Sequence, residues 1–186
     1  MNASGATPEP AVKKRFPVAV AMIAGIVLIG LVILFALQIK NANQDTLSIG
    51  TDIPDFTVTS FSGETFRKSQ LEGKIILLNF WSSWCASCDE EGEVLEEVWQ
   101  EVKDDGDIVF LGVNYVDTEK DSLAFLEKYG ITFPNGPDMG SRISQMFKVE
   151  AVPETYIIDR DGKLAAIQIG PFQSADEIRA ALELGD

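Results

Sequence analysis

The longest feature of the hydrophobic pattern is a run of 24 uncharged, mostly apolar residues from Phe16 to Ile39. A bilayer core about 30 Å thick needs about 20 apolar helical residues, so this run predicts a single transmembrane helix. A cleavable signal peptide has a shorter apolar core of about 7–15 residues and a small-residue cleavage site, and residues 35–40 offer no convincing site. We therefore expect an uncleaved signal-anchor.

The charges on either side of this run predict its orientation. Residues 13–15 are all basic and precede the run, whereas only Lys40 follows it closely. Positive residues favour the cytoplasmic side of a membrane, so the amino terminus is expected inside and the remainder outside. This predicts a single-pass protein of the cell membrane, with a cytoplasmic tail (1–15), an anchor (16–39), a linker (40–48) and one extracytoplasmic domain (49–186).

Within the domain, apolar runs and helical spacings alternate. Continuous apolar runs at 74–81 and 108–115 are typical of strands that are buried on both faces. Apolar residues recur with helical spacing over residues 86–102. Residues 53–61, the turn signal Ser62-Gly63 and residues 65–67 predict an N-terminal β-hairpin.

The second half of the domain continues the alternation. Thr118 with Asp121, and Ser174 with Glu177, are capping patterns that predict helices running to about residues 129 and 184. A short helix is expected over 140–147, and Asp161-Gly162 predicts a hairpin turn between strands 156–159 and 164–170. The order of the elements predicts an α/β fold, a mixed sheet with helices on both faces.

Charge and composition exclude several functions. Four of the 15 Lys and Arg residues and one of the 29 Asp and Glu residues precede residue 41, which leaves 11 against 28 and a net charge of −17. Nucleic acid is therefore not expected as a partner. Histidine is absent and there are only two cysteines, which excludes Ser-His and Cys-His catalysis and a structural zinc site.

The two cysteines, Cys85 and Cys88, follow the first buried strand directly and open the helix over 86–102. A helix N-terminus and the Cys-x-x-Cys arrangement both lower a thiol pKa, and the thiolate is the attacking species. We expect Cys85 to attack and Cys88, one helical turn further on, to be more buried and to resolve the mixed disulfide. The alternatives are two buried small apolar residues or half of a metal site shared with a second chain.

The sequence around the cysteines resembles the thioredoxin superfamily, and most closely its membrane-anchored TlpA/ResA/CcmG (DsbE)-like branch. The resemblance covers about residues 48–184, and four segments carry it. They are Gly50-Thr51-Asp52-Ile53-Pro54-Asp55-Phe56, Gly73-Lys74 with Leu78-Asn79-Phe80-Trp81, Trp84-Cys85-Ala86-Ser87-Cys88, and Val152-Pro153-Glu154-Thr155 with Ile158-Asp159 and Gly162.

This resemblance implies a thioredoxin fold and electron transfer by dithiol-disulfide exchange, with no cofactor besides the redox-active cysteine pair. It implies that Pro153 is a cis-proline beside the disulfide and that Val152 presents its backbone to a peptide. Trp84 and Glu154 are further candidate substrate contacts. The expected partners are disulfides of extracytoplasmic proteins, among them apocytochrome c in cytochrome c maturation, and a membrane thiol or other electron donor.

Glu91 is the candidate acid-base group. Thioredoxin has a buried Asp in the strand before its cysteines, but the matching residue here is Asn79, which cannot titrate. Residues 88, 91, 95, 98 and 102 share one helix face, which places Glu91 beside Cys88. A partly buried carboxyl group should have a raised pKa and could exchange a proton with Cys88. The alternative is an ordinary acid that complements the helix N-terminus.

Two other functions stay open from the sequence. A peroxiredoxin-like peroxide reductase is suggested by the entry segment and by Gly73-Lys74 with the strand that follows. Peroxiredoxins use a Thr-x-x-Cys motif, however, whereas this chain has Ser82 at the threonine position and adds Cys88 in the helix. A copper-delivering thiol metallochaperone would use the same two sulfurs, although no His or Met cluster accompanies them.

Overall fold

The computed structural model describes residues 18–44 and 47–186. The chain divides into two compact units, residues 1–46 and 47–186, which we treat separately. In the first, helix α1 spans Val18–Gln44. It continues beyond residue 39, where we predicted its end, because no Gly or Pro interrupts residues 40–44. The predicted tail, 1–15, and the first two residues of the predicted anchor lie outside the described residues.

A membrane-spanning helix was the other expectation for this unit. Across the described ranges, 18–44 and 47–186, no helix has both the length and the apolar character that crossing a bilayer requires.

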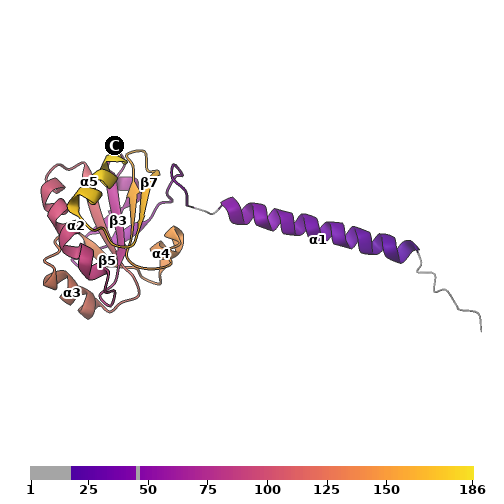
Figure 1. The fold of residues 1–186 in the computed structure, drawn as a ribbon, viewed down its shortest axis with the longest axis horizontal. Coiled ribbons are helices and arrows are strands. Elements are labelled where there is room, and N and C mark those ends of the chain that lie inside the picture. The colour runs from indigo at the N-terminus through magenta and orange to yellow at the C-terminus, as the bar shows by residue number, and fades with distance from the viewer. Residues whose placement is uncertain (1–17, 45–46) are drawn as a thin grey trace, which may run out of the picture. The chain divides into compact units, whose positions relative to one another are not determined.

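The second unit is the predicted α/β domain (Figure 1). Its strands are β1 (Thr57–Thr59), β2 (Thr65–Arg67), β3 (Ile75–Trp81), β4 (Ile108–Asn114), β5 (Asn135–Pro137), β6 (Glu154–Ile158) and β7 (Leu164–Ile169). Its helices are α2 (Cys88–Val102), α3 (Glu119–Lys128), α4 (Arg142–Phe147), α5 (Ala175–Glu183) and a short 3-10 turn, Lys68–Gln70.

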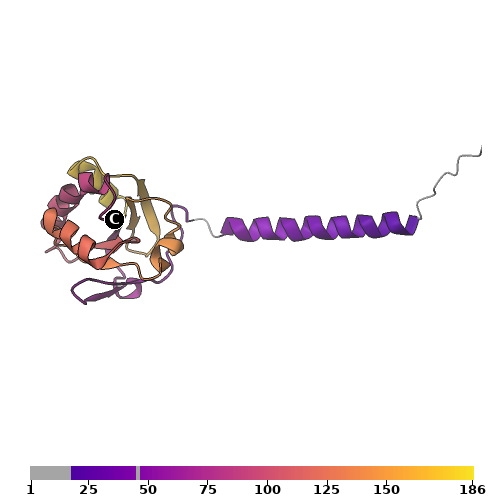
Figure 2. The ribbon, with the colours of Figure 1, turned by 90° about the horizontal axis from the view of Figure 1, so that it is seen from below.

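Five strands form a mixed central sheet in the order β5-β4-β3-β6-β7. β3 pairs with β4 and β4 with β5 in parallel, whereas β3–β6 and β6–β7 are antiparallel. The predicted hairpin forms a separate two-stranded sheet, β1–β2, which stands out at one edge of the domain in Figure 2. β3 is the central strand of the sheet. The cysteines that follow it therefore lie beyond its carboxyl end, at the middle of that end of the sheet.

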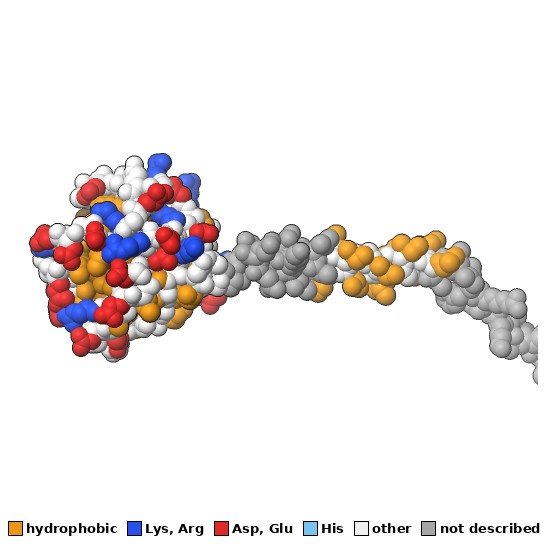
Figure 3. Space-filling model, turned by 90° about the horizontal axis from the view of Figure 1, so that it is seen from above, with side chains coloured by type: hydrophobic (Ala, Val, Ile, Leu, Met, Phe, Trp, Pro, Cys, Tyr) orange, Lys and Arg blue, Asp and Glu red, His pale blue; other side chains and the backbone are white. Residues whose placement is uncertain are grey.

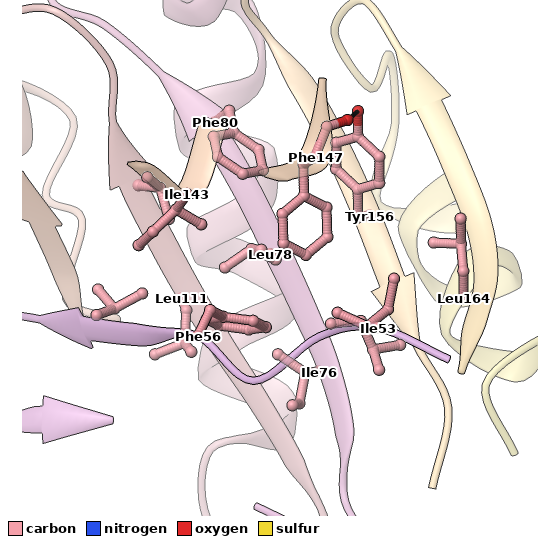
Figure 4. Packing of buried hydrophobic residues seen from close by; sticks show 13 residues of the cluster. Ile53, Phe56, Ile76, Leu78, Phe80, Leu111, Ile143, Phe147, Tyr156 and Leu164 are labelled. Carbon is pink, nitrogen blue, oxygen red and sulfur yellow. Dashed lines mark hydrogen bonds between the residues drawn. The ribbon is translucent and has the colours of Figure 1, made fainter. Parts of the chain in front are cut away.

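Both faces of β3 are buried, as its unbroken apolar run predicted. Ile76, Leu78 and Phe80 point to a face covered by α4 and by the segment before β1 (Figure 4). There Phe80 and Phe147 pack with ring centroids 5.5 Å apart. Leu77 points to the opposite face, which α2 and α5 cover. β3 is therefore packed on both faces up to the residues that precede the cysteines.

The observed helix caps agree with those predicted from the sequence. The start of α2 and the strand β5 differ from the prediction. The Thr118 and Ser174 hydroxyls accept hydrogen bonds from the N–H groups three residues on, as predicted. α2 begins at Cys88, two residues later than predicted. The strand β5 was not predicted, because Asn135-Gly136-Pro137 has the composition of a turn and becomes a strand only by pairing with β4.

Candidate active site

The two cysteines lie where the chain passes from β3 to α2. The structure is the oxidised form, in which a disulfide joins Cys85 and Cys88 with Cα atoms 5.3 Å apart. Cys85 has 6% of its surface exposed and Cys88 1%, so the expectation that Cys88 is the more buried is met. Cys85 is the sulfur that a partner reaches first.

Three groups surround the Cys85 sulfur. The backbone N–H of Cys88, the first residue of α2, donates to Sγ at 3.1 Å. The Ser87 hydroxyl lies 3.6 Å from Sγ, and the carbonyl oxygen of Val152 lies 3.4 Å from it. After reduction, the N–H and hydroxyl groups favour a thiolate, because hydrogen bonds to a charged form stabilise it. The surroundings of Cys85 therefore suit an attacking sulfur.

The segment opposite Cys85 has the predicted backbone geometry. The Val152–Pro153 peptide bond is cis, and Pro153 is buried directly before β6. Val152 packs against the apolar cluster that contains both cysteines. The backbone of Val152 thus lies beside the sulfur that a substrate would approach.

Glu91 is buried inside the domain, with 1% of its surface exposed. Its Oε1 accepts a hydrogen bond from the Asn79 amide at 2.8 Å, and its Oε2 accepts one from the Phe172 N–H at 3.1 Å. Burial raises the pKa of Glu91 to about 7, and the two hydrogen bonds, which favour the carboxylate, offset only part of that effect. The side chain can therefore take up or release a proton near neutral pH.

Asn79 connects Glu91 to the neighbouring strand. Its amide also donates to the Thr155 hydroxyl on β6 at 2.9 Å. Asn79, Glu91 and Cys88 are among the residues that line one small pocket, which brings the acid and the resolving cysteine to the same part of the domain. Asn79 cannot titrate, but it orients the carboxyl group that can.

Glu154 lies elsewhere than expected. Its carboxylate accepts hydrogen bonds from the N–H groups of Glu150 and Ala151, each at 3.3 Å, and from the Tyr156 hydroxyl at 2.7 Å. It is 3% exposed, so it cannot offer its side chain to a substrate in this form. Burial, together with the Glu154 carboxylate, raises the pKa of Tyr156. We assign Glu154 a positioning role, because it holds the loop that leads to Val152.

Trp84 is the predicted contact that does face solvent, with 61% of its surface exposed. Its indole N–H donates to the carbonyl oxygen of Val116 at 2.9 Å. The preceding residue, Ser83, donates its N–H and its hydroxyl to the Asp117 carboxylate at 2.6 and 2.9 Å. The segment after β4 therefore fixes the loop that carries Cys85.

Three residues of this site were not identified from the sequence: Asp117, Thr155 and Phe172. Asp117 had one available signal, since it follows β4 and the carboxyl ends of neighbouring parallel strands meet at one sheet edge. Phe172 contributes only a backbone N–H, which no side-chain pattern reveals. Neither Thr155 nor Phe172 could be placed without knowing how β6 and β7 fold back.

The site shows no further candidate for metal binding. Within residues 18–44 and 47–186, no three His, Cys, Asp or Glu side chains are grouped so as to hold a metal ion. The chemistry that this arrangement offers is exchange between the Cys85–Cys88 pair and another thiol or disulfide.

Comparison with known proteins gives a consistent result. Residues 49–167 match the model of the AhpC/TSA family. The thiol-disulfide oxidoreductase ResA of Bacillus anthracis is 30% identical over 142 residues, which are 76% of this chain and 81% of that protein. ResA of Geobacillus kaustophilus is 31% identical over 133 residues, 72% of this chain and 76% of that protein.

Solved structures show the same similarity. A secreted Mycobacterium tuberculosis disulfide oxidoreductase homologous to E. coli DsbE superimposes with a TM-score of 0.61 and 26% sequence identity. The match covers 69% of this chain and 94% of that one. The residues that the family model matches, 49–167, include the cysteine pair.

Proposed function

Because the chain belongs to the AhpC/TSA family and is a thiol-disulfide oxidoreductase of the ResA and DsbE type, we propose that it reduces disulfides of extracytoplasmic proteins. The observation that carries this proposal is the asymmetry of the two sulfurs. Cys85 lies beside the Val152 carbonyl and is the more exposed of the pair, whereas Cys88 is more deeply buried and lines the same small pocket as Glu91.

The proposed reaction starts from the reduced protein. The Cys85 thiolate attacks one sulfur of a substrate disulfide, that S–S bond breaks, and the other substrate sulfur leaves as a thiolate. Cys88 then attacks Cys85 Sγ in the mixed disulfide, which releases the second substrate thiolate and forms the Cys85–Cys88 disulfide. Two electrons pass to the substrate, whose thiolates take up two protons. A dithiol donor at the membrane returns the pair to its reduced form.

Glu91 supplies the proton acceptor for the second step. Cys88 must lose its proton to attack, and Glu91 carries the one carboxyl group among the residues that line the pocket beside it. A carboxyl group with a pKa of about 7 accepts a thiol proton more readily than an exposed glutamate does. The pair carries both electrons itself, so the proposal requires no bound cofactor.

The location is proposed from residues 16–39. Within α1, residues 22–35 expose their large apolar side chains at 55–70% of their surface (Figure 3). Together with the basic residues before it, this supports a membrane anchor with the catalytic domain outside the cytoplasm. A compartment in which disulfides form readily is one that needs a dedicated reductant, for substrates such as the Cys-x-x-Cys motif of apocytochrome c.

The reduction potential tests the direction of electron flow. Ala86 and Ser87, between the cysteines, add neither charge nor proline, so nothing in the loop favours a strongly oxidising pair. Equilibration of the full chain with glutathione buffers should give a potential closer to that of thioredoxin, about −270 mV, than to that of DsbA, about −120 mV. A value near that of DsbA would overturn the assignment as a reductant.

Trapping identifies the partners. In Cys88→Ser the resolving step is blocked, so Cys85 should remain in mixed disulfides that survive non-reducing electrophoresis and disappear with dithiothreitol. The double variant Cys85→Ser/Cys88→Ser is the matched control and should trap nothing. Trapped proteins that are all cytoplasmic would contradict the proposed compartment.

The peroxide reductase alternative gains no support from the site. The Ser82 hydroxyl donates to the carbonyl oxygen of Tyr115 on the adjacent segment, and Ser82 is fully buried. The Ser82 hydroxyl therefore makes a structural hydrogen bond and is not free to bind a peroxide at Cys85.

A further inference from the structure

The two edges of the central sheet are protected to different degrees. At one edge, β5 is three residues long and ends in Pro137, and it lies so close to β1 that any side chain at Gly136 would collide with the Thr59 carbonyl oxygen. At the other edge, β7 is six residues long and pairs with β6 on one side (Figure 1). Natural proteins shorten, charge or cover edge strands, because unpaired backbone groups there can bind another strand.

The outer side of β7 is covered at its start. There the Leu164 N–H donates to the Thr51 carbonyl oxygen at 2.9 Å, and the Gly50 N–H donates to the Leu164 carbonyl oxygen at 2.7 Å. Within residues 47–186, no strand pairs with this side of β7 beyond Leu164. Residues 165–169 therefore form an open edge of the sheet.

The open edge presents both backbone groups and apolar side chains. Just after β7, the Gly170 N–H donates to the Pro153 carbonyl oxygen at 2.9 Å. Because hydrogen-bonded residues alternate along an antiparallel pair, Gln168 also faces β6, and the backbone groups of Ile167 and Ile169 point outward. The side chains of these two isoleucines are 36% and 70% exposed. Such an edge is a ready template for another strand.

The open edge is also uncharged. No Asp, Glu, Lys or Arg occurs between Lys163 and Asp176, although residues 41–186 carry 28 acidic and 11 basic residues. A net charge far from zero keeps copies of a protein apart. The exposed side of α2, with Glu90 and Glu93, would bring like charges together if two copies met there. Two copies that meet at β7 avoid this repulsion.

We propose that β7 is the interface of a homodimer in which the central sheets of two copies join edge to edge. Identical strands that meet across a two-fold axis pair in antiparallel directions. If Gln168 lies opposite Gln168 of the partner subunit, Ile167 lies opposite Ile169 of the partner subunit, and symmetry produces this pair twice. A shift of this pairing toward the start of β7 would bring the partner onto Leu164, where residues 50–52 already lie.

The proposed interface extends beyond the strand. A groove of about 550 Å³ lies between β7 and α5, and its lining includes Ala166, Ile167, Phe172 and Leu184. Leu184 is 63% exposed, so it adds apolar surface next to the open edge. One strand and one side of a helix form an interface smaller than those of permanent dimers. We therefore expect a dimer that dissociates on dilution.

Sedimentation velocity of the full chain in mild detergent, over a range of protein concentrations, tests the dimer. Ile169→Lys places a charge in both isoleucine pairs and should raise the dissociation constant at least about tenfold. Leu123→Lys is the matched control, because Leu123 is 43% exposed on α3, away from β7, and it should leave the constant unchanged. A chain that stayed monomeric throughout the range, or a dimer that Ile169→Lys did not weaken, would overturn the proposal.

A cross-link distinguishes the β7 edge from any other contact between copies, including one through α1. In the Cys85→Ser/Cys88→Ser variant, Gln168→Cys adds a thiol opposite its own copy. Opposite residues that are not hydrogen-bonded have Cα atoms about 4.5 Å apart, within the range of a disulfide. Mild oxidation should give a covalent dimer with Gln168→Cys and far less with Glu93→Cys, an exposed position on α2. Equal yields from the two positions would overturn the proposed strand pairing.

Discussion

Cys85→Ser should lower the rate constant for disulfide reduction by about a thousandfold or more, because a serine hydroxyl does not ionise near neutral pH and cannot replace an attacking thiolate. Cys88 cannot take over, since it is 1% exposed and lies beneath Cys85. The measurement is a single turnover of the reduced full chain with a peptide disulfide. Loss of the resolving step alone, in Cys88→Ser, should leave the first attack measurable as one equivalent of released thiol.

The comparison of Cys85→Ser with Cys88→Ser tests which sulfur attacks and which resolves. Ser87→Ala is the control for general disturbance of the loop, because it removes a hydroxyl that lies 3.6 Å from Cys85 Sγ and leaves both sulfurs in place. It should change the rate constant far less than Cys85→Ser does. If Cys85→Ser released one equivalent of thiol and Cys88→Ser released none, the roles of attacking and resolving sulfur would be reversed.

The sequence predicted those parts of the site that depend on local spacing. Glu91 follows Cys88 by three residues, and a helix brings such residues to one face, so their common place in the lining of one small pocket could be expected. The strand that leads to Cys85 was recognisable because both of its faces are apolar. The mixed sheet was predicted correctly from the order of the elements, and the antiparallel pair β6–β7 at its edge from the turn Asp161-Gly162.

What the sequence could not predict are contacts between segments that are far apart in the chain. The Phe172 N–H donates to Glu91 across 81 positions, and the Asn79 amide donates to Thr155 across 76. The position of Glu154 was also not predictable from neighbouring residues alone. Its place beside Pro153 suggested a substrate contact, but strand alternation turns its side chain into the core with Tyr156, where it holds the loop instead.

The buried surroundings of Glu91 also predict that the free energy of unfolding depends on pH. The pKa of Glu91 is about 7 in the folded protein and 4.5 for the ordinary group. Between pH 4.5 and pH 7, Glu91 is therefore protonated in the folded state and ionised in the unfolded state. The stabilising contribution is complete below about pH 4.5 and is lost as the pH rises through 7. A shift of 7 minus 4.5, or about 2.5 units, corresponds to about 3 kcal/mol.

Glu91→Gln removes this titration, so its free energy of unfolding should rise relative to the wild type by about 3 kcal/mol between about pH 4 and pH 8. The loss or gain of a hydrogen bond to Phe172 or Asn79 would add an offset that does not depend on pH. Urea unfolding of the oxidised full chain in mild detergent, at several pH values, measures the change. Glu93→Gln, at an exposed position on the same helix, is the matched control and should run parallel to the wild type. A Glu91→Gln curve that also ran parallel would show that Glu91 does not retain its proton on folding, and the proton acceptor for Cys88 would have to be sought elsewhere.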